Sequence, residues 1–232
     1  NRLEELPAAL GDCAALVDLN LSANRLTTLP HRLGRLARLR TLGLGANRLR
    51  VLPDTLGGLH ALRTLQLGEN RLAALPAQLA ECVALEDLGL AQNRLDDVPH
   101  ELGLLPALRS LVLAAGRFEA LPASLGDLAR LERLELSGGK LFELPPTLGS
   151  LTALRSLRAA DCRLASLPAG LSHLTALTSL RLDGNRLHAL PHDLGGMCAL
   201  GELWAGGNML SSLPTGIGGC AALSTLGLPS NR

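Results

Sequence analysis

Aromatic side chains are almost absent from this chain, which has two Phe, one Trp and no Tyr among its 232 residues. A core of ordinary composition uses aromatic rings as large fillers. Here 47% of the residues are hydrophobic while only 1% are aromatic, so the interior must be built from aliphatic side chains. Leucine, the most frequent of them, is the obvious candidate.

An excess of one charge, long apolar runs and closely spaced cysteines are missing as well. The 22 basic and 21 acidic residues leave a net charge of +1, which gives no global field toward nucleic acid or an anionic membrane. No apolar run approaches the roughly 18–20 residues of a membrane span. The five cysteines form no CxxC pair. They therefore indicate reduced thiols in a reducing compartment, and we expect a cytoplasmic protein.

The chain does have a fixed period. Asn stands at positions 1, 24, 47, 70, 93, 185, 208 and 231, at steps of 23 residues and one step of 92, which is four periods. Gly116, Gly139 and Cys162 occupy the three intervening registers. An unbroken period of this length predicts a solenoid, in which each unit packs only against its neighbours.

The apolar spacing changes inside each unit. In the first unit, Leu10, Cys13 and Leu16 are three residues apart, whereas Leu19 and Leu21 are two apart. This predicts a brief helical or 3-10 return, which Pro7 would begin, followed by a short strand. Glycines recur eleven residues into most units and are expected to keep the helical turn short.

A lone unit cannot bury enough apolar surface to offset the entropy of ordering 23 residues. The units must therefore stack. We expect an α/β solenoid of about ten repeats, shaped as a curved horseshoe. A parallel sheet would line its concave face, with short helical or irregular segments on its convex face.

Two segments, "LVDLNLSANRL" (16–26) and "LTSLRLDGNRL" (177–187), resemble the leucine-rich-repeat signature LxxLxLxxNxL. The resemblance covers the whole chain. The 23-residue period with "LP" and "LG" is similar to the intracellular Ras-group subfamily of plant Ras-group-related proteins and animal Ras-signalling scaffolds. In this family the signature Asn bonds backbone groups of neighbouring turns. The resemblance therefore implies an asparagine ladder formed by Asn24, Asn47, Asn70, Asn93, Asn185 and Asn208.

The ladder is broken in three consecutive repeats, at Gly116, Gly139 and Cys162. Glycine supplies no side-chain bond and a thiol is a weak donor. Sequence drift with water filling the gap is one interpretation. Reshaping of the middle of the solenoid for a partner is the other, and Phe118 beside the gap indicates that the core is repacked there.

Reactive side chains are spread along the stack. His31, His100 and His192 share one column but lie three or four turns apart, at about 5 Å per turn, so we expect no metal site. Cys13 and Cys82 fall in the buried-leucine column, as does Cys220, and are interpreted as small core residues. We predict no enzyme activity and no cofactor.

The residue after each ladder position is basic in ten of eleven registers. This arginine column is interpreted as solvated cover for the loops. Acidic residues balance it and aromatic stacking partners are missing, so we expect no nucleic-acid binding.

Residues that flank the strand leucines point to solvent, and they change character along the chain. They are small and mostly neutral in the first repeats, but large and charged between positions 133 and 204. Because Trp and Arg are enriched at binding hot spots, we predict a protein-binding face. Its predicted members are Arg133, Glu135, Arg158, Asp161, Arg181, Asp183, Glu202 and Trp204. The alternative is that Trp204 is a stray surface residue or a lid over the small Ala205.

The sequence therefore favours a non-catalytic, monomeric protein-interaction scaffold. We expect residues 1–232 to form one leucine-rich-repeat domain, cut from a longer solenoid without its terminal caps. The resemblance implies intracellular signalling, with a small GTPase or a signalling regulator as partner. The first alternative is the sensing domain of a larger receptor, kinase or ubiquitin ligase. An extracellular receptor is the second, since "NLS" at 20–22 is a glycosylation sequon.

Overall fold

Every 23-residue unit folds into one short 3-10 helix followed by one three-residue strand. The computed structural model describes all residues from 1 to 232. The 3-10 helices are η1 (Ala8–Asp12), η2 (His31–Arg35), η3 (Asp54–Gly58), η4 (Ala77–Glu81), η5 (His100–Leu104), η6 (Ala123–Asp127), η7 (Pro146–Ser150), η8 (Ala169–His173), η9 (Leu194–Gly196) and η10 (Thr215–Gly219). The strands are β1 (Asp18–Asn20), β2 (Thr41–Gly43), β3 (Thr64–Gln66), β4 (Asp87–Gly89), β5 (Ser110–Val112), β6 (Arg133–Glu135), β7 (Ser156–Arg158), β8 (Ser179–Arg181), β9 (Glu202–Trp204) and β10 (Thr225–Gly227).

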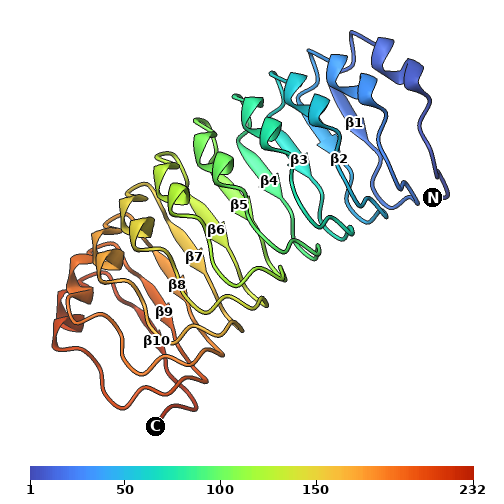
Figure 1. Cartoon of the computed structure of the whole chain (residues 1–232). Helices are drawn as coiled ribbons and strands as arrows, with labels where there is room; N and C mark the ends of the chain where they lie inside the picture. Colours follow the sequence, from blue (N-terminus) through green and yellow to red (C-terminus); the bar gives the residue numbers. More distant parts are fainter.

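The ten strands form one open parallel sheet in chain order, β1 to β10. Each strand pairs with the next without a shift, so the central leucines Leu19, Leu42 and Leu65 are direct neighbours. Figure 1 shows the resulting stack, with the 3-10 helices along one edge, loops along the opposite edge and the strands between them. The predicted leucine-rich-repeat solenoid of about ten repeats is confirmed.

Proline begins nearly every 3-10 helix, as the sequence predicts. Pro30, for example, has φ −68° and ψ 138° at the N-cap of η2. The helix η9 departs from this pattern, because it is only three residues long and has Asp193 at its N-cap. None of the helices is long and apolar enough to cross a membrane.

The recurring glycine of the 3-10 helices has a packing role that the sequence did not reveal. A Cβ at Gly34 would lie 1.9 Å from the carbonyl oxygen of Thr55 in the next repeat, and one at Gly103 would lie 2.2 Å from that of Ser124. Successive helices therefore stack backbone against backbone. The glycine column permits this close approach, in addition to the predicted effect on helix length.

The core is a single cluster of 59 buried residues, nearly all of them leucine. Phe118 is its one aromatic member, which fits the scarcity of aromatic residues in the sequence. Cys82 and Cys220 are buried at leucine positions, as predicted. The prediction for Cys13 was wrong: its side chain is exposed, because within residues 1–232 the first repeat packs against another repeat on one side only.

Candidate functional site

The signature asparagines join successive turns through both ends of their amide groups. The Nδ2 group of Asn47 donates to the carbonyl oxygens of Leu21 and Leu44, at 3.0 Å each. Its Oδ1 accepts the backbone N–H of Leu26, also at 3.0 Å. Asn70 makes the equivalent contacts with its own neighbours.

The same pattern recurs at Asn93, Asn185 and Asn208. Asn24 makes part of this pattern: its Oδ1 accepts the N–H of Leu3, and its Nδ2 group donates to the carbonyl oxygen of Leu21. These amides satisfy backbone groups that would otherwise be buried without a partner.

The three repeats without a ladder asparagine differ in what stands in place of its side chain. A Cβ at Gly116 would lie 2.0 Å from the Phe118 ring, so this ring occupies the space of the missing amide. The Cys162 thiol donates to the carbonyl oxygens of Leu136 and Ala160, at 3.5 Å each. Gly139 has no substitute, and the nearest atom to a Cβ there is the Gly116 carbonyl oxygen at 3.3 Å.

One consequence is common to the three repeats. In the intact ladder, the asparagine Oδ1 accepts a backbone N–H 21 residues earlier. At the gap, the corresponding N–H groups of Leu95, Phe118 and Leu141 have no acceptor within the chain. Since each buried unmade hydrogen bond costs about 1–3 kcal/mol, this segment is a weak point of the stack.

The predicted binding residues meet on the exposed face of β6 to β9, near the centre of the stack in Figure 1 and toward its C-terminal end. The strand register places Glu135, Arg158, Arg181 and Trp204 in one row across these four strands. In the parallel row, Arg133 and Glu202 stand at the two ends with serines between them.

Two arginines of these rows contact carboxylates of neighbouring strands. Arg158 lies 3.8 Å from the Glu135 carboxylate, and Arg181 lies 3.9 Å from that of Glu202. The Arg181 guanidinium also lies over the indole of Trp204, 5.8 Å from the ring centroid. Such half-exposed ion pairs add little stability, typically about 0–1 kcal/mol.

Trp204 does not stand away from the sheet as the sequence suggested. Its side chain is half-buried and leans toward β10, where a Cβ at Gly227 would lie 2.2 Å from the ring. The indole Nε1 of Trp204 and the Nε atoms of Arg158 and Arg181 are shielded from solvent without a hydrogen-bond partner. Three adjacent side chains of this face thus carry unsatisfied donors.

The two aspartates predicted at the border of this face have structural contacts of their own. The Asp183 carboxylate accepts the backbone N–H of Gly206 at 2.9 Å. Asp161 has a left-handed backbone with φ 52°, and its carboxylate lies across Gly184, 2.2 Å from where a Cβ would be. Both remain at the rim of the face, but neither projects freely toward a partner.

A sequence signal for these leaning side chains was available but overlooked. Large residues of the third strand position are followed, 23 residues later, by glycine in three cases: Asn20 and Gly43, Gln66 and Gly89, and Trp204 and Gly227. In each pair the large side chain occupies the space over the glycine. The pairing of a large residue with a following glycine therefore predicts the lean.

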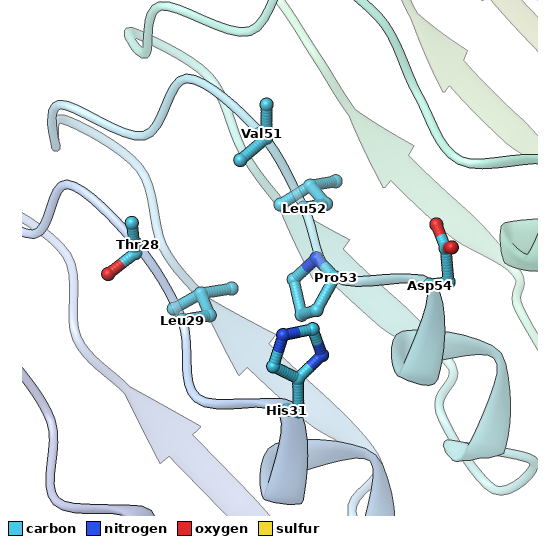
Figure 2. A pocket seen from close by; sticks show the side chains of 7 residues that line it. All are labelled: Thr28, Leu29, His31, Val51, Leu52, Pro53 and Asp54. Carbon is cyan, nitrogen blue, oxygen red and sulfur yellow. The ribbon is translucent and has the colours of Figure 1, made fainter.

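Two residues of the histidine column line hollows between successive repeats. His31 takes part in one of about 300 Å³, together with Thr28, Leu29, Val51, Leu52, Pro53 and Asp54. Figure 2 shows its imidazole beside Pro53 of the next repeat. His100 lines a separate hollow of about 440 Å³. His31 and His100 thus lie in different hollows, as their spacing predicts.

Comparisons with known proteins agree with this geometry. A sequence profile described as a leucine-rich repeat region matches residues 4–140 and 97–205. No curated protein sequence is significantly similar to the chain.

Several solved structures are similar over the whole length. A leucine-rich-repeat protein of Leptospira interrogans is 29% identical over 100% of this chain and 65% of its own, with a TM-score of 0.79. The PEPR1–AtPEP1 structure is 31% identical over 99% of this chain and 34% of its own, with a TM-score of 0.87.

The Arabidopsis receptor kinase HAESA, solved with the peptide hormone IDA and the co-receptor SERK1, is 26% identical. The match covers 100% of this chain and 46% of HAESA, with a TM-score of 0.80. Across these three structures, this chain spans between 34% and 65% of the protein it matches.

Proposed function

This chain belongs to the leucine-rich-repeat family, and we propose that it binds a protein partner on the face of β6 to β9. The fold is generally a non-catalytic interaction module, whose stacked repeats create an extended binding surface. The proposed contact residues are Arg133, Glu135, Arg158, Arg181, Glu202 and Trp204, with Asp161 and Asp183 at the rim.

The unsatisfied donors of Arg158, Arg181 and Trp204 carry this proposal. A shielded donor without an acceptor is costly, and native proteins contain few of them. The three donors lie on adjacent strands. A small rotation of each side chain would present its donor to carbonyl or carboxylate oxygens of a partner. An indole and guanidinium groups are also the side chains most enriched at binding hot spots.

Charge supports the same surface. The three arginines are interspersed with the carboxylates of Glu135 and Glu202, so both signs of charge occur within four neighbouring strands. Mixed charges of this kind fix the orientation of a partner and raise the association rate more than they raise affinity. Most of the affinity would then come from the desolvated contact of Trp204.

We further propose that the partner is an intracellular signalling protein, such as a small GTPase or a regulator of one, and that the chain acts as a cytoplasmic monomer. The 23-residue period with "LP" and "LG" and the five free cysteines support this setting. Light scattering of the purified chain tests the monomeric state, and imaging of a fluorescent fusion tests the cytoplasmic location.

A second candidate is the ligand-sensing repeat domain of a larger receptor. Its support is that the chain matches less than half of HAESA, a receptor kinase solved with a peptide hormone. Determining the complete open reading frame around residues 1–232 separates the two candidates. A kinase or a membrane span in it would favour the receptor.

Replacement of Trp204 by Ala tests the binding face. Loss of a hot-spot tryptophan should cost at least about 2 kcal/mol of binding free energy, about thirtyfold in affinity. Thr64→Ala is the matched control, because Thr64 lies on the same sheet face at β3, far from the patch. A Trp204→Ala chain that keeps its circular dichroism and binds its partner with undiminished affinity would contradict the proposal.

A further inference from the structure

A second surface of the solenoid carries an unexplained concentration of positive charge. A hollow of about 440 Å³ is lined by Arg50, Val51, Arg71, Ala73, Arg94, Asp96 and Arg117. All four of its arginines are exposed. None of them takes part in any ion pair of the chain.

The regular stacking of the repeats creates this hollow. Arg71, Arg94 and Arg117 follow the ladder position in three consecutive repeats, so about 10 Å, two repeat steps, separates the first from the last. Arg50 and Asp96 belong to a neighbouring column with Ala73 between them. Because Ala73 is small, it leaves a depression that the longer side chains surround.

The charge of the hollow is strongly unbalanced, although that of the whole chain is not. Four guanidinium groups face one carboxylate, that of Asp96, which leaves a local excess of three positive charges. Like charges at this spacing repel each other, and no acidic side chain of the chain pairs with them. An anionic ligand would relieve this repulsion.

We propose that this hollow binds a small soluble ligand that carries at least two phosphate groups. The planar fork of arginine matches phosphate oxygens with two parallel hydrogen bonds, and this geometry is stronger and more selective than a point charge. The volume of about 440 Å³ lies in the range of small-molecule sites. Val51 and Ala73 are its only apolar side chains, so an apolar ligand does not fit.

The same features disfavour a nucleic acid. Single strands are held by aromatic side chains on which successive bases stack. The hollow contains no aromatic residue, and its positive charge is concentrated over a few repeats. This site is separate from the proposed protein-binding face, since none of its residues lies in β6 to β9.

Calorimetric titration of the intact chain with inorganic tripolyphosphate tests the proposal. Arg94→Gln should weaken binding by about tenfold or more, because charge-assisted hydrogen bonds are lost. Arg71→Gln is a second variant with the same expected loss. Asp96→Asn should tighten binding severalfold, because it removes the only negative charge of the hollow.

Two matched controls separate a shaped site from general positive charge. Arg163→Gln removes an arginine of the same column, outside the hollow, and should change affinity by less than about twofold because surface charges are screened over distance. Ala73→Leu fills the depression without a change of charge and should abolish binding, whereas Ala165→Leu in the same column should not. Trp204→Ala should leave tripolyphosphate binding unchanged, even if it abolishes partner binding.

The proposal is overturned if tripolyphosphate does not bind, or if Arg163→Gln weakens binding as much as Arg94→Gln does. It is also overturned if folded Ala73→Leu binds as well as the wild-type chain. Anionic lipid vesicles and a single-stranded oligonucleotide serve as further probes. Binding of either with higher affinity than tripolyphosphate would assign the arginines to a membrane or a nucleic acid instead.

Discussion

One repeat departs from the ordinary sequence twice, with Gly116 in place of Asn and Phe118 in place of Leu. We expect the two departures to compensate each other, and a double-mutant cycle can measure this compensation. A Cβ at Gly116 would lie 2.0 Å from the Phe118 ring. Gly116→Asn alone should therefore overpack the core and destabilise the chain by about 1–3 kcal/mol. The new amide has no room to take its ladder position while the ring is present.

Phe118→Leu alone should also destabilise. Phe118 is only 1% exposed, so loss of part of its ring removes buried apolar surface and leaves a hole beside Gly116. We expect a loss of roughly 1–2 kcal/mol. The double variant restores the sequence of an ordinary repeat, and its amide can accept the free N–H of Leu95. Its stability should be equal to that of the wild type or up to about 1 kcal/mol higher.

Urea unfolding followed by circular dichroism measures the three variants and the wild type. The coupling energy between the two positions should be at least about 2 kcal/mol in favour of the double variant. Amide exchange at Leu95 provides a local check, since its N–H should become protected only in the double variant. Additive losses, within about 0.5 kcal/mol, would refute the inference that the ring replaces the amide.

Three further predictions concern single sites. Gly139→Asn should stabilise the chain by about 0.5–1.5 kcal/mol in the same urea assay, because its amide can accept the N–H of Phe118. No gain would show that the loop cannot hold a side chain. Burial raises the pKa of the Cys82 thiol to about 11, so alkylation at pH 8 should modify the exposed Cys198 far faster than Cys82, and equal rates would contradict the buried position. The Ser172 hydroxyl donates to the Asp193 carboxylate at 2.6 Å and lowers the pKa of Asp193, which Ser172→Ala should raise in an NMR titration. A carboxylate whose pKa is lowered in the folded state stabilises the fold above its ordinary pKa of about 3.9, and this stabilisation is lost as the pH falls through the folded-state pKa. The free energy of unfolding of Ser172→Ala should therefore fall less than that of the wild type between pH 5 and acid.

The repeat architecture could be predicted from the sequence because the period and the change of apolar spacing are local features. Each strand leucine, such as Leu42 or Leu65, stands two residues from the next core position and 23 from its neighbour in the sheet. These spacings fix the strand, the register and the stacking order. Proline at the start of the 3-10 helices adds a further local signal.

Contacts between repeats are harder to predict, because they depend on the sizes of side chains that neighbour each other only after folding. The lean of a large side chain over a glycine 23 residues later has a sequence signal, whereas the filling of the ladder gap by a ring has none. The Phe118 ring fills the space over Gly116, and the Trp204 indole leans over Gly227. The arginine column is uniform in sequence, but the residues beside it vary in size, and a hollow forms around the small Ala73. The error at Cys13 has another origin, since the first repeat packs against another repeat on one side only within residues 1–232.

Quenching of Trp204 fluorescence by acrylamide tests the central claim, that the face of β6 to β9 binds a protein partner, most directly. Trp204 is the only tryptophan of the chain, so its emission reports on β9 alone. A partner without tryptophan, or one labelled with a spectrally distinct analogue, should protect the indole from quenching. Arg181→Ala should weaken this protection, because Arg181 lies over the ring. A saturating partner that leaves the quenching of Trp204 unchanged would contradict the account.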